Sequence, residues 1–315
     1  MKEMYTPMTT AHKSRVLDMT RGDPFRLLLQ FSLPLFCSNL LQQVYNLTDT
    51  ALAGHLLGSA ALAEIGATAA LYGLIMNFAF GMNNGLALTV SRCFGAGERE
   101  GIRRAVGWMV TLSAAVSLVL TTVSLLGRGA LLQALQVPAE VWDGAAAYLT
   151  VILLGIPLTM LYNMEAALLR AVGNSVTPLL FLLFSSVLNV GLDAAFMGPL
   201  GMGVRGAAVA TVLAQGISAV LGAVYLVRSY PELHFTLAHL KKSARRAVMN
   251  MFWAGMSMGL MSAIYNLGSV ALQSSINALG SVYITAQTAA RRMAEIRQGQ
   301  LTSAAVLGKL EKLGL

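Results

Sequence analysis

Oxygen-bearing side chains occur in stretches of this chain that are otherwise apolar. Asp49 lies in one such stretch, Asn189 and Asp193 lie four residues apart in another, and Thr211 lies in a third. If these stretches cross a membrane, each carboxylate is costly and is expected to face a protein interior or a water-filled cavity. Two carboxylates held close together cannot both stay ionised cheaply, and a bound proton or Na⁺ relieves that cost. These residues predict a site for a proton or a cation.

The rest of the chain supplies the helices that such a site needs. Of its 315 residues, 56% are hydrophobic and 11% are charged, and the mean hydropathy is +0.65. Soluble domains carry about 25% charged residues, so the composition predicts an all-α polytopic membrane protein. Stretches long enough to cross a bilayer as helices are expected at residues 27–56, 65–91, 104–127, 145–169, 177–198, 205–227 and 247–276, with a partial eighth from Val282.

Basic residues cluster in alternate loops. The N-terminal tail, residues 1–26, is polar and basic without the apolar region of a signal peptide, and the loop at residues 58–66 contains no Lys or Arg. The strongest cluster is Lys241, Lys242, Arg245 and Arg246. The positive-inside rule therefore predicts a multi-pass protein of the cytoplasmic membrane with its N-terminus in the cytoplasm. These clusters also account for the net charge of +8, so no nucleic-acid partner is expected.

This topology places the polar residues at one depth. Asp49, Asp193 and Thr211 fall in the outer halves of the first, fifth and sixth spans, and Tyr148 reaches a comparable level in the fourth. Such a cluster indicates a coupling-ion site, and the alternative is a network of polar groups that only holds the helices together. Glu165 lies near the opposite end of the fourth span and is expected to act as a local charge partner for Arg170.

The chain also contains a weak internal repeat. Residues 45–47 (YNL) recur at residues 265–267, and residues 68–70 (TAA) recur at residues 288–290, both at an offset of 220. The seventh span is therefore interpreted as a second copy of the first, as in transporters built from duplicated bundles. The expected organisation is a cytoplasmic tail, a six-helix lobe, the start of a second lobe, and a divergent polar or amphipathic tail, at residues 1–26, 27–240, 241–293 and 294–315. The chain is thus expected to be an incomplete product.

In order along the chain, several motifs resemble those of the multidrug and toxic compound extrusion (MATE) family. They are YNLTDTALAGH at residues 45–55, RCFGAGERE at 92–100, RAVGNSVTP at 170–178, LNVGLD at 188–193 and GVRGAAVAT at 203–211. The resemblance implies a six-helix lobe of a twelve-helix transporter, plus the seventh helix and a partial eighth. It also implies export of small organic cations across the cytoplasmic membrane in exchange for Na⁺ or H⁺.

The resemblance assigns roles to individual residues. It implies that the coupling site contains Asp49, Asn189, Asp193, Thr211 and Tyr148, with Na⁺ able to bind at the first four. It further implies substrate contacts in the cavity at Gln42, Tyr45 and Asn163. The seventh span has no acidic residue, so the chain resembles the branch that couples through the first lobe.

Alternative functions differ in how well the sequence supports them. The chain could be a non-transporting fragment, or a half-transporter that needs a missing second lobe or a second copy of itself. A flippase for anionic lipid-linked oligosaccharides is less favoured, because the span interiors have essentially no Lys or Arg to neutralise a phosphate. An enzyme is not expected, because the sequence has no nucleophile–base pair, phosphate-binding loop or metal-ligand spacing. Apart from the coupling ion, no cofactor is expected.

Overall fold

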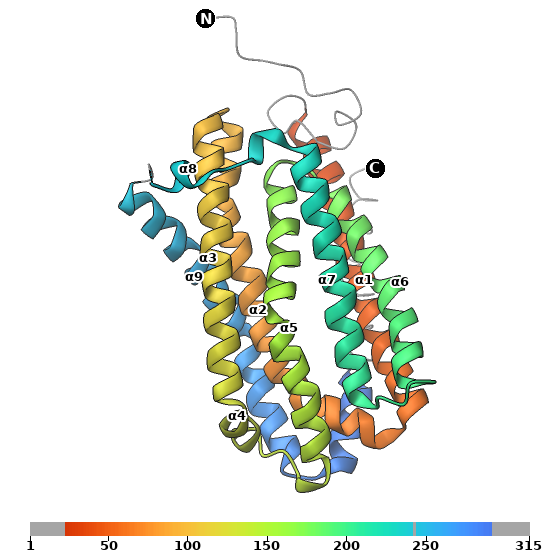
Figure 1. Ribbon diagram of the computed structural model, residues 1–315. Helices are drawn as coiled ribbons and strands as arrows, with labels where there is room; N and C mark the ends of the chain where they lie inside the picture. The colour runs from red at the N-terminus through yellow and green to blue at the C-terminus, as the bar shows by residue number, and fades with distance from the viewer. Residues whose placement is uncertain (1–22, 242–243, 292–315) are drawn as a thin grey trace, which may run out of the picture.

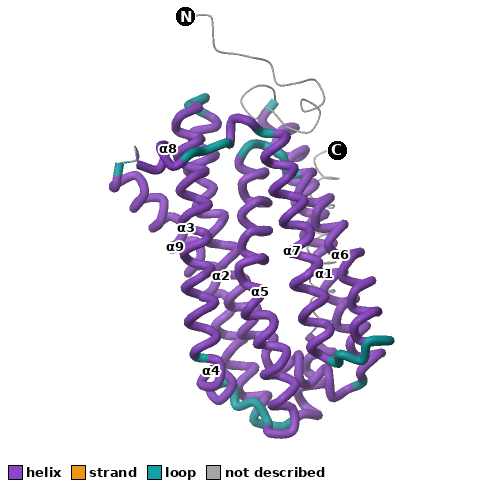
Figure 2. Tube along the Cα trace, in the orientation of Figure 1, coloured by secondary structure: helices purple, strands orange, loops and turns teal. Residues whose placement is uncertain are grey.

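The structure is a computed structural model, and it describes residues 23–241 and 244–291. Within these ranges the regular structure is entirely helical (Figures 1 and 2). The α-helices are α1 (Pro24–Leu57), α2 (Ser59–Gly95), α3 (Arg99–Leu126), α4 (Arg128–Ala134), α5 (Trp142–Ala171), α6 (Val176–Met197), α7 (Val204–Ser229), α8 (Leu237–Lys241) and α9 (Arg245–Asn277). Short 3-10 turns lie at Ala139–Val141 and Pro231–Leu233, and residues 281–291 are again helical.

Seven of the described helical segments are long and apolar enough to cross a membrane. They are Phe25–Leu57, Ser59–Gly95, Arg99–Leu126, Ala139–Ala171, Val176–Met197, Val204–Ser229 and Arg245–Ile264. These segments include most of each expected span, which confirms the all-α polytopic fold class. The expected tails at residues 1–22 and 292–315 lie outside the described residues, and the boundaries between the lobes remain a prediction.

The first connection is shorter than expected. Residues 58–66 were expected to form a loop, but α2 begins at Ser59, and the connection from α1 is Gly58 alone. Gly58 has a φ of 83°, which a residue with a side chain rarely adopts. The expectation was wrong because the run from Ser59 to Glu64 contains mostly Ala and Leu, which are strong helix formers.

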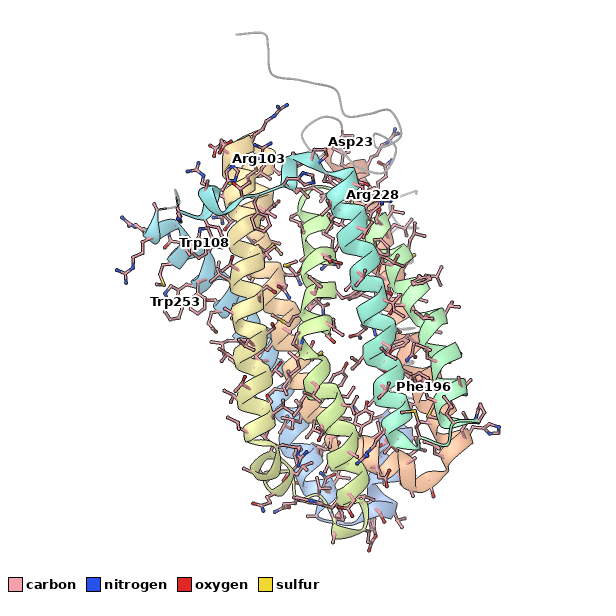
Figure 3. The ribbon with its side chains drawn as sticks, viewed as in Figure 1. Asp23, Arg103, Trp108, Phe196, Arg228 and Trp253 are labelled. Atoms are coloured by element: carbon pink, nitrogen blue, oxygen red, sulfur yellow. The ribbon has the colours of Figure 1, made fainter. Side chains whose placement is uncertain are left out.

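The long helices form a bundle in two groups (Figure 1). α2, α3, α5 and α9 lie on one side, and α1, α6 and α7 lie on the other. The groups meet where α5 packs against α7. Figure 3 shows Asp23, Arg103 and Arg228 at one end of the bundle, while Phe196 lies towards the other. The elements alternate in direction as the sequence predicted, although the side of the membrane on which the N-terminus lies remains a prediction.

Glycines bring α9 close to α2. Gly81 and Gly85 on α2 face Gly255 and Gly259 on α9, and each pair has the G-x-x-x-G spacing. A Cβ added at Gly85 would lie 2.5 Å from the carbonyl oxygen of Ala254. Small residues at this spacing allow the backbones of membrane helices to approach closely. The seventh long helix is therefore packed directly on the second.

Candidate cation site

The candidate site lies where α1, α6 and α7 meet. α6 packs against both α1 and α7, and it carries Asn189 and Asp193 on one face, four residues apart. Asp49 lies eight residues before the end of α1, and Thr211 lies seven residues after the start of α7. Because α7 runs antiparallel to α1 and α6, these positions fall at one level of the bundle, as the sequence predicted.

The polar groups on α6 are buried completely. Asn189 and Asp193 are each 0% exposed, and Thr211 is 8% exposed. The Asn189 side-chain amide donates a hydrogen bond to Thr211 Oγ1 at 3.4 Å. Neither carboxylate oxygen of Asp193, nor Asn189 Oδ1, receives a hydrogen bond of ordinary geometry from the described residues. Such buried acceptors are costly unless a ligand or water supplies the missing donor.

The two carboxylates interact with one another. Asp49 is the charged group that acts on the Asp193 carboxylate, and the amide of Asn189 lies beside the same carboxylate. Tyr45, one turn before Asp49 on α1, lies near Thr211 and near both carboxylates. The structure thus brings together Tyr45, which was assigned to the substrate cavity, and the residues assigned to the coupling site.

The remaining predicted residues are Tyr148, Gln42 and Asn163. Tyr148 on α5 is 7% exposed and packs with Ala53, Met197 and Ala207, which lie one helical turn from Asp49, Asp193 and Thr211, so it borders the site. The side-chain amide of Gln42 donates to Asn46 Oδ1 on its own helix at 3.3 Å. Asn163 likewise donates within α5, to the carbonyl oxygen of Thr159 at 2.9 Å.

Two residues that the sequence analysis did not select extend the site. Tyr72 on α2 interacts electrostatically with Asp49 and is also a neighbour of Gln215 on α7. Gln215 in turn accepts a hydrogen bond from Thr159 Oγ1 of α5 at 2.5 Å. Gln215 lies one helical turn after Thr211, and this spacing is the signal that could have identified it.

The donor set fits a proton or a small hard cation. Two carboxylates, an amide oxygen and a hydroxyl are oxygen ligands, which hard cations prefer. A proton shared by the carboxylates would also lower their mutual repulsion. The MatE family model matches residues 34–195, which is more than half of the chain and includes all of these residues except Thr211 and Gln215.

The chain belongs to the MatE family of MATE transporters.

Individual relatives agree with this assignment. The chain is 28% identical over 282 residues to "Probable multidrug resistance protein YpnP" of Bacillus subtilis (strain 168), covering 90% of this chain and 63% of that protein. It is 26% identical to "Probable multidrug resistance protein YoeA" of the same organism, covering 89% of this chain and 61% of that protein. A solved structure, "Crystal structure of MATE in complex with MaL6", matches with a TM-score of 0.73 at 21% identity, covering 93% of this chain and 71% of that one.

These comparisons confirm the MATE family and the MATE fold. They also show that the chain spans about 60% of the length of the two curated relatives.

Proposed function

We propose that this chain forms the coupling lobe of an exporter of small organic cations, driven by the exchange of H⁺ or Na⁺ at Asp49 and Asp193. The observation that supports this proposal is the pair of interacting carboxylates, in which the oxygens of Asp193 are buried and receive no hydrogen bond of ordinary geometry from the described residues. Asn189, Thr211 and Tyr45 provide the neutral oxygens around the pair. The names of the relatives, each a "Probable multidrug resistance protein", support drug-like small molecules as substrates, and the two carboxylates in the lobe favour cations among them.

The coupling mechanism follows from the cost of the buried charges. When the site is empty, the carboxylates repel each other and favour the arrangement of α1, α6 and α7 that separates them or admits water. When a proton or Na⁺ binds, the repulsion falls and the helices can close around the ion. A ligand that binds one arrangement better than the other shifts the equilibrium between them. In an antiporter, that shift would open the substrate cavity to the other side of the membrane.

Dye efflux tests the proposal. The chain would be expressed in cells that lack their own exporters. It would be expressed alone and as a chimaera completed with the second lobe of one of the two Bacillus subtilis relatives. Ethidium efflux would be measured under an imposed pH gradient and, separately, under a Na⁺ gradient. We expect Asp49→Asn and Asp193→Asn to abolish efflux without reducing membrane insertion. Asp143→Asn, at an exposed aspartate at the start of α5, is the matched control and should transport normally.

The outcomes separate the alternatives. Export at the parental rate by both the Asp49→Asn and the Asp193→Asn variants would refute coupling at this pair. If the chimaera exports dye and the chain alone does not, the chain works as a half that needs a partner. If the chain alone and the chimaera both insert correctly and neither exports dye, the non-transporting alternative is favoured. Transport of a lipid pyrophosphate in place of ethidium would instead favour a flippase.

A further inference from the structure

Glu165 is a buried acid that the proposed coupling site does not use. It lies on α5, it is 4% exposed, and its Oε1 has no hydrogen-bond partner among the described residues. The ion pairs found in the described part of the chain do not include it. A charged carboxylate inside a membrane costs about 2.5–3.5 kcal/mol or more when it is not compensated. Glu165 therefore needs a proton or another partner.

The expected partner, Arg170, is directed elsewhere. Its guanidinium donates to Asn84 Oδ1 on α2 at 3.2 Å and lies 5.8 Å from the centre of the Phe80 ring. The prediction that Glu165 pairs with Arg170 was therefore wrong. The physical reason for this difference is that α2 offers Arg170 an amide acceptor and an aromatic face, both of which stabilise a guanidinium.

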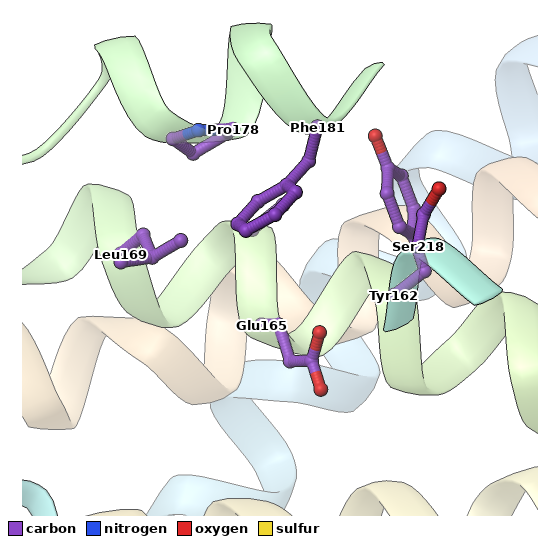
Figure 4. A pocket seen from close by; sticks show the side chains of 7 residues that line it. Tyr162, Glu165, Leu169, Pro178, Phe181 and Ser218 are labelled. Carbon is purple, nitrogen blue, oxygen red and sulfur yellow. The ribbon is translucent and has the colours of Figure 1, made fainter. Parts of the chain in front are cut away.

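A small cavity lies beside Glu165 (Figure 4). α5 contributes Tyr162 and Glu165 to its wall, α6 contributes Phe181, and α7 contributes Ser218. Ser218 is 1% exposed, and its hydroxyl oxygen also has no hydrogen-bond partner among the described residues. The cavity has room for about one water molecule, so it excludes an organic cation.

Gly222 allows the carboxylate to reach α7. A Cβ added at Gly222 would collide with Glu165 Oε2, so the space beside this glycine is filled by the carboxylate. Among the described titratable groups, the one that faces the carboxyl is Tyr162, also from α5, and Arg170 lies on the far side of Tyr162 towards α2. From α6 and α7 the cavity receives apolar side chains and the Ser218 hydroxyl. A hard metal cation takes about six oxygen ligands, and this small set of oxygens suits a proton better.

Polar residues on one face of α7 connect this cavity with the carboxylate pair. Thr211, Gln215, Ser218 and Gly222 are spaced by four, three and four residues, which places them on one side of the helix. Thr211 accepts a hydrogen bond from Asn189, and Gln215 accepts one from Thr159. At 1.5 Å per residue, Thr211 and Ser218 are separated by about 10 Å along the axis.

We propose that Glu165, with Ser218 across the cavity, forms a second proton-holding site in the lobe, and that it exchanges its proton with the Asp49–Asp193 pair along this face of α7. The proton-holding site rests on the burial of Glu165 and on the cavity. The exchange also rests on the proposed function, because it requires the pair to bind protons.

Infrared spectroscopy of the purified chain in lipid nanodiscs tests the site. We expect a carbonyl-stretch band of a protonated carboxyl at neutral pH that is lost in Glu165→Gln and retained in Glu98→Gln, which changes an exposed glutamate. Ser218→Ala, a milder change, should shift the frequency of this band, because the hydroxyl across the cavity is removed. A spectrum that is the same in wild type, Glu165→Gln and Ser218→Ala would overturn the proposal.

The same band separates this proposal from the proposed function. Asp193→Asn should leave the Glu165 band in place, even if Asp49 and Asp193 prove to have no role in transport. Gln215→Leu should slow the exchange of the Glu165 proton for deuterium at least about fivefold, which corresponds to about 1 kcal/mol. Exchange at the wild-type rate would show that the proton does not follow α7, and would leave Glu165 as a separate proton site.

Discussion

Two polar clusters in this lobe are equally buried but differ in how their hydrogen bonds are satisfied. Asn174, between α5 and α6, is 0% exposed, as is Asp193. The amide of Asn174 donates to Thr177 Oγ1 at 2.8 Å and to Tyr230 Oη at 2.9 Å. Its Oδ1 accepts a hydrogen bond from the backbone N–H of Thr177 at 3.0 Å. The carboxylate of Asp193, by contrast, receives no hydrogen bond of ordinary geometry from the described residues, although the Asn189 amide lies beside it.

The difference indicates that the two clusters contribute differently to the stability of the fold. The Asn174 cluster holds the first turn of α6 against the chain that follows α7, so its hydrogen bonds contribute to stability. The oxygens of Asp193 contribute little to stability, since burying them without donors costs free energy. Free energy that is lost in this way can be recovered when a proton or cation binds. The comparison therefore predicts that changes in the two clusters will have opposite effects on stability and transport.

The largest expected effect is on transport, and it is expected at Asp193, whose carboxylate lacks hydrogen bonds of ordinary geometry. Asp193→Asn in the completed protein should reduce coupled dye efflux more than about tenfold, because it removes a charge that the coupling ion compensates. Its thermal unfolding temperature in detergent should not fall, because a neutral amide is cheaper to bury than a carboxylate. A fall in unfolding temperature that matches the loss of efflux would show that Asp193 is a structural residue.

In the Asn174 cluster, whose polar groups are hydrogen-bonded, the main expected effect is on stability. Asn174→Ala leaves the Thr177 N–H and the Tyr230 hydroxyl without this partner, so the free energy of unfolding should fall by about 1–3 kcal/mol. Efflux per folded molecule should be unchanged. Asn77→Ala is the matched control, because that amide donates to Gly73 within its own helix, and it should shift stability by less than about 0.5 kcal/mol. Equal losses in the two variants would contradict the prediction.

The smallest expected effect is at Tyr230, which lies just after α7. Tyr230→Phe removes the hydroxyl that accepts from Asn174 and also interacts with Tyr225, and it should cost about 1 kcal/mol at neutral pH. Burial raises the pKa of Tyr230 from 10.0 to about 12, although its hydrogen bond with Asn174 acts in the opposite direction. The folded state therefore favours the neutral phenol, and its stabilising contribution is present below pH 10 and is lost as the pH rises towards 12. The difference in unfolding temperature between wild type and Tyr230→Phe should shrink over that range, and a constant difference would contradict the assigned pKa.

Much of the fold follows from the sequence, since apolar stretches interrupted by basic loops fix the number and direction of the helices. The meeting of Asp49 and Asp193 could also be predicted, because the topology places them at one depth. Tyr72 was missed because a single polar side chain in an apolar stretch carries no periodic signal, whereas Gln215 could have been identified from its spacing of one helical turn from Thr211. The direction of Arg170 towards Asn84 depends on how α2 and α5 pack, which a sequence pattern does not encode. The hydrogen bond from Asn174 to Tyr230 likewise depends on packing, because the two residues are 56 positions apart in the sequence.

The close packing of α9 on α2 has a consequence for how the molecule comes apart. Beyond the interdigitated glycines, Asn277 donates to the carbonyl oxygens of Ala67 and Leu135, at 3.1 and 2.7 Å, and Thr285 donates to that of Ser59 at 3.0 Å. α9 and the helical residues after it are thus attached to the lobe by contacts along their length, in addition to the covalent connection after α7. A protease that cuts between Tyr230 and Ala244 would produce two fragments that still migrate together in detergent.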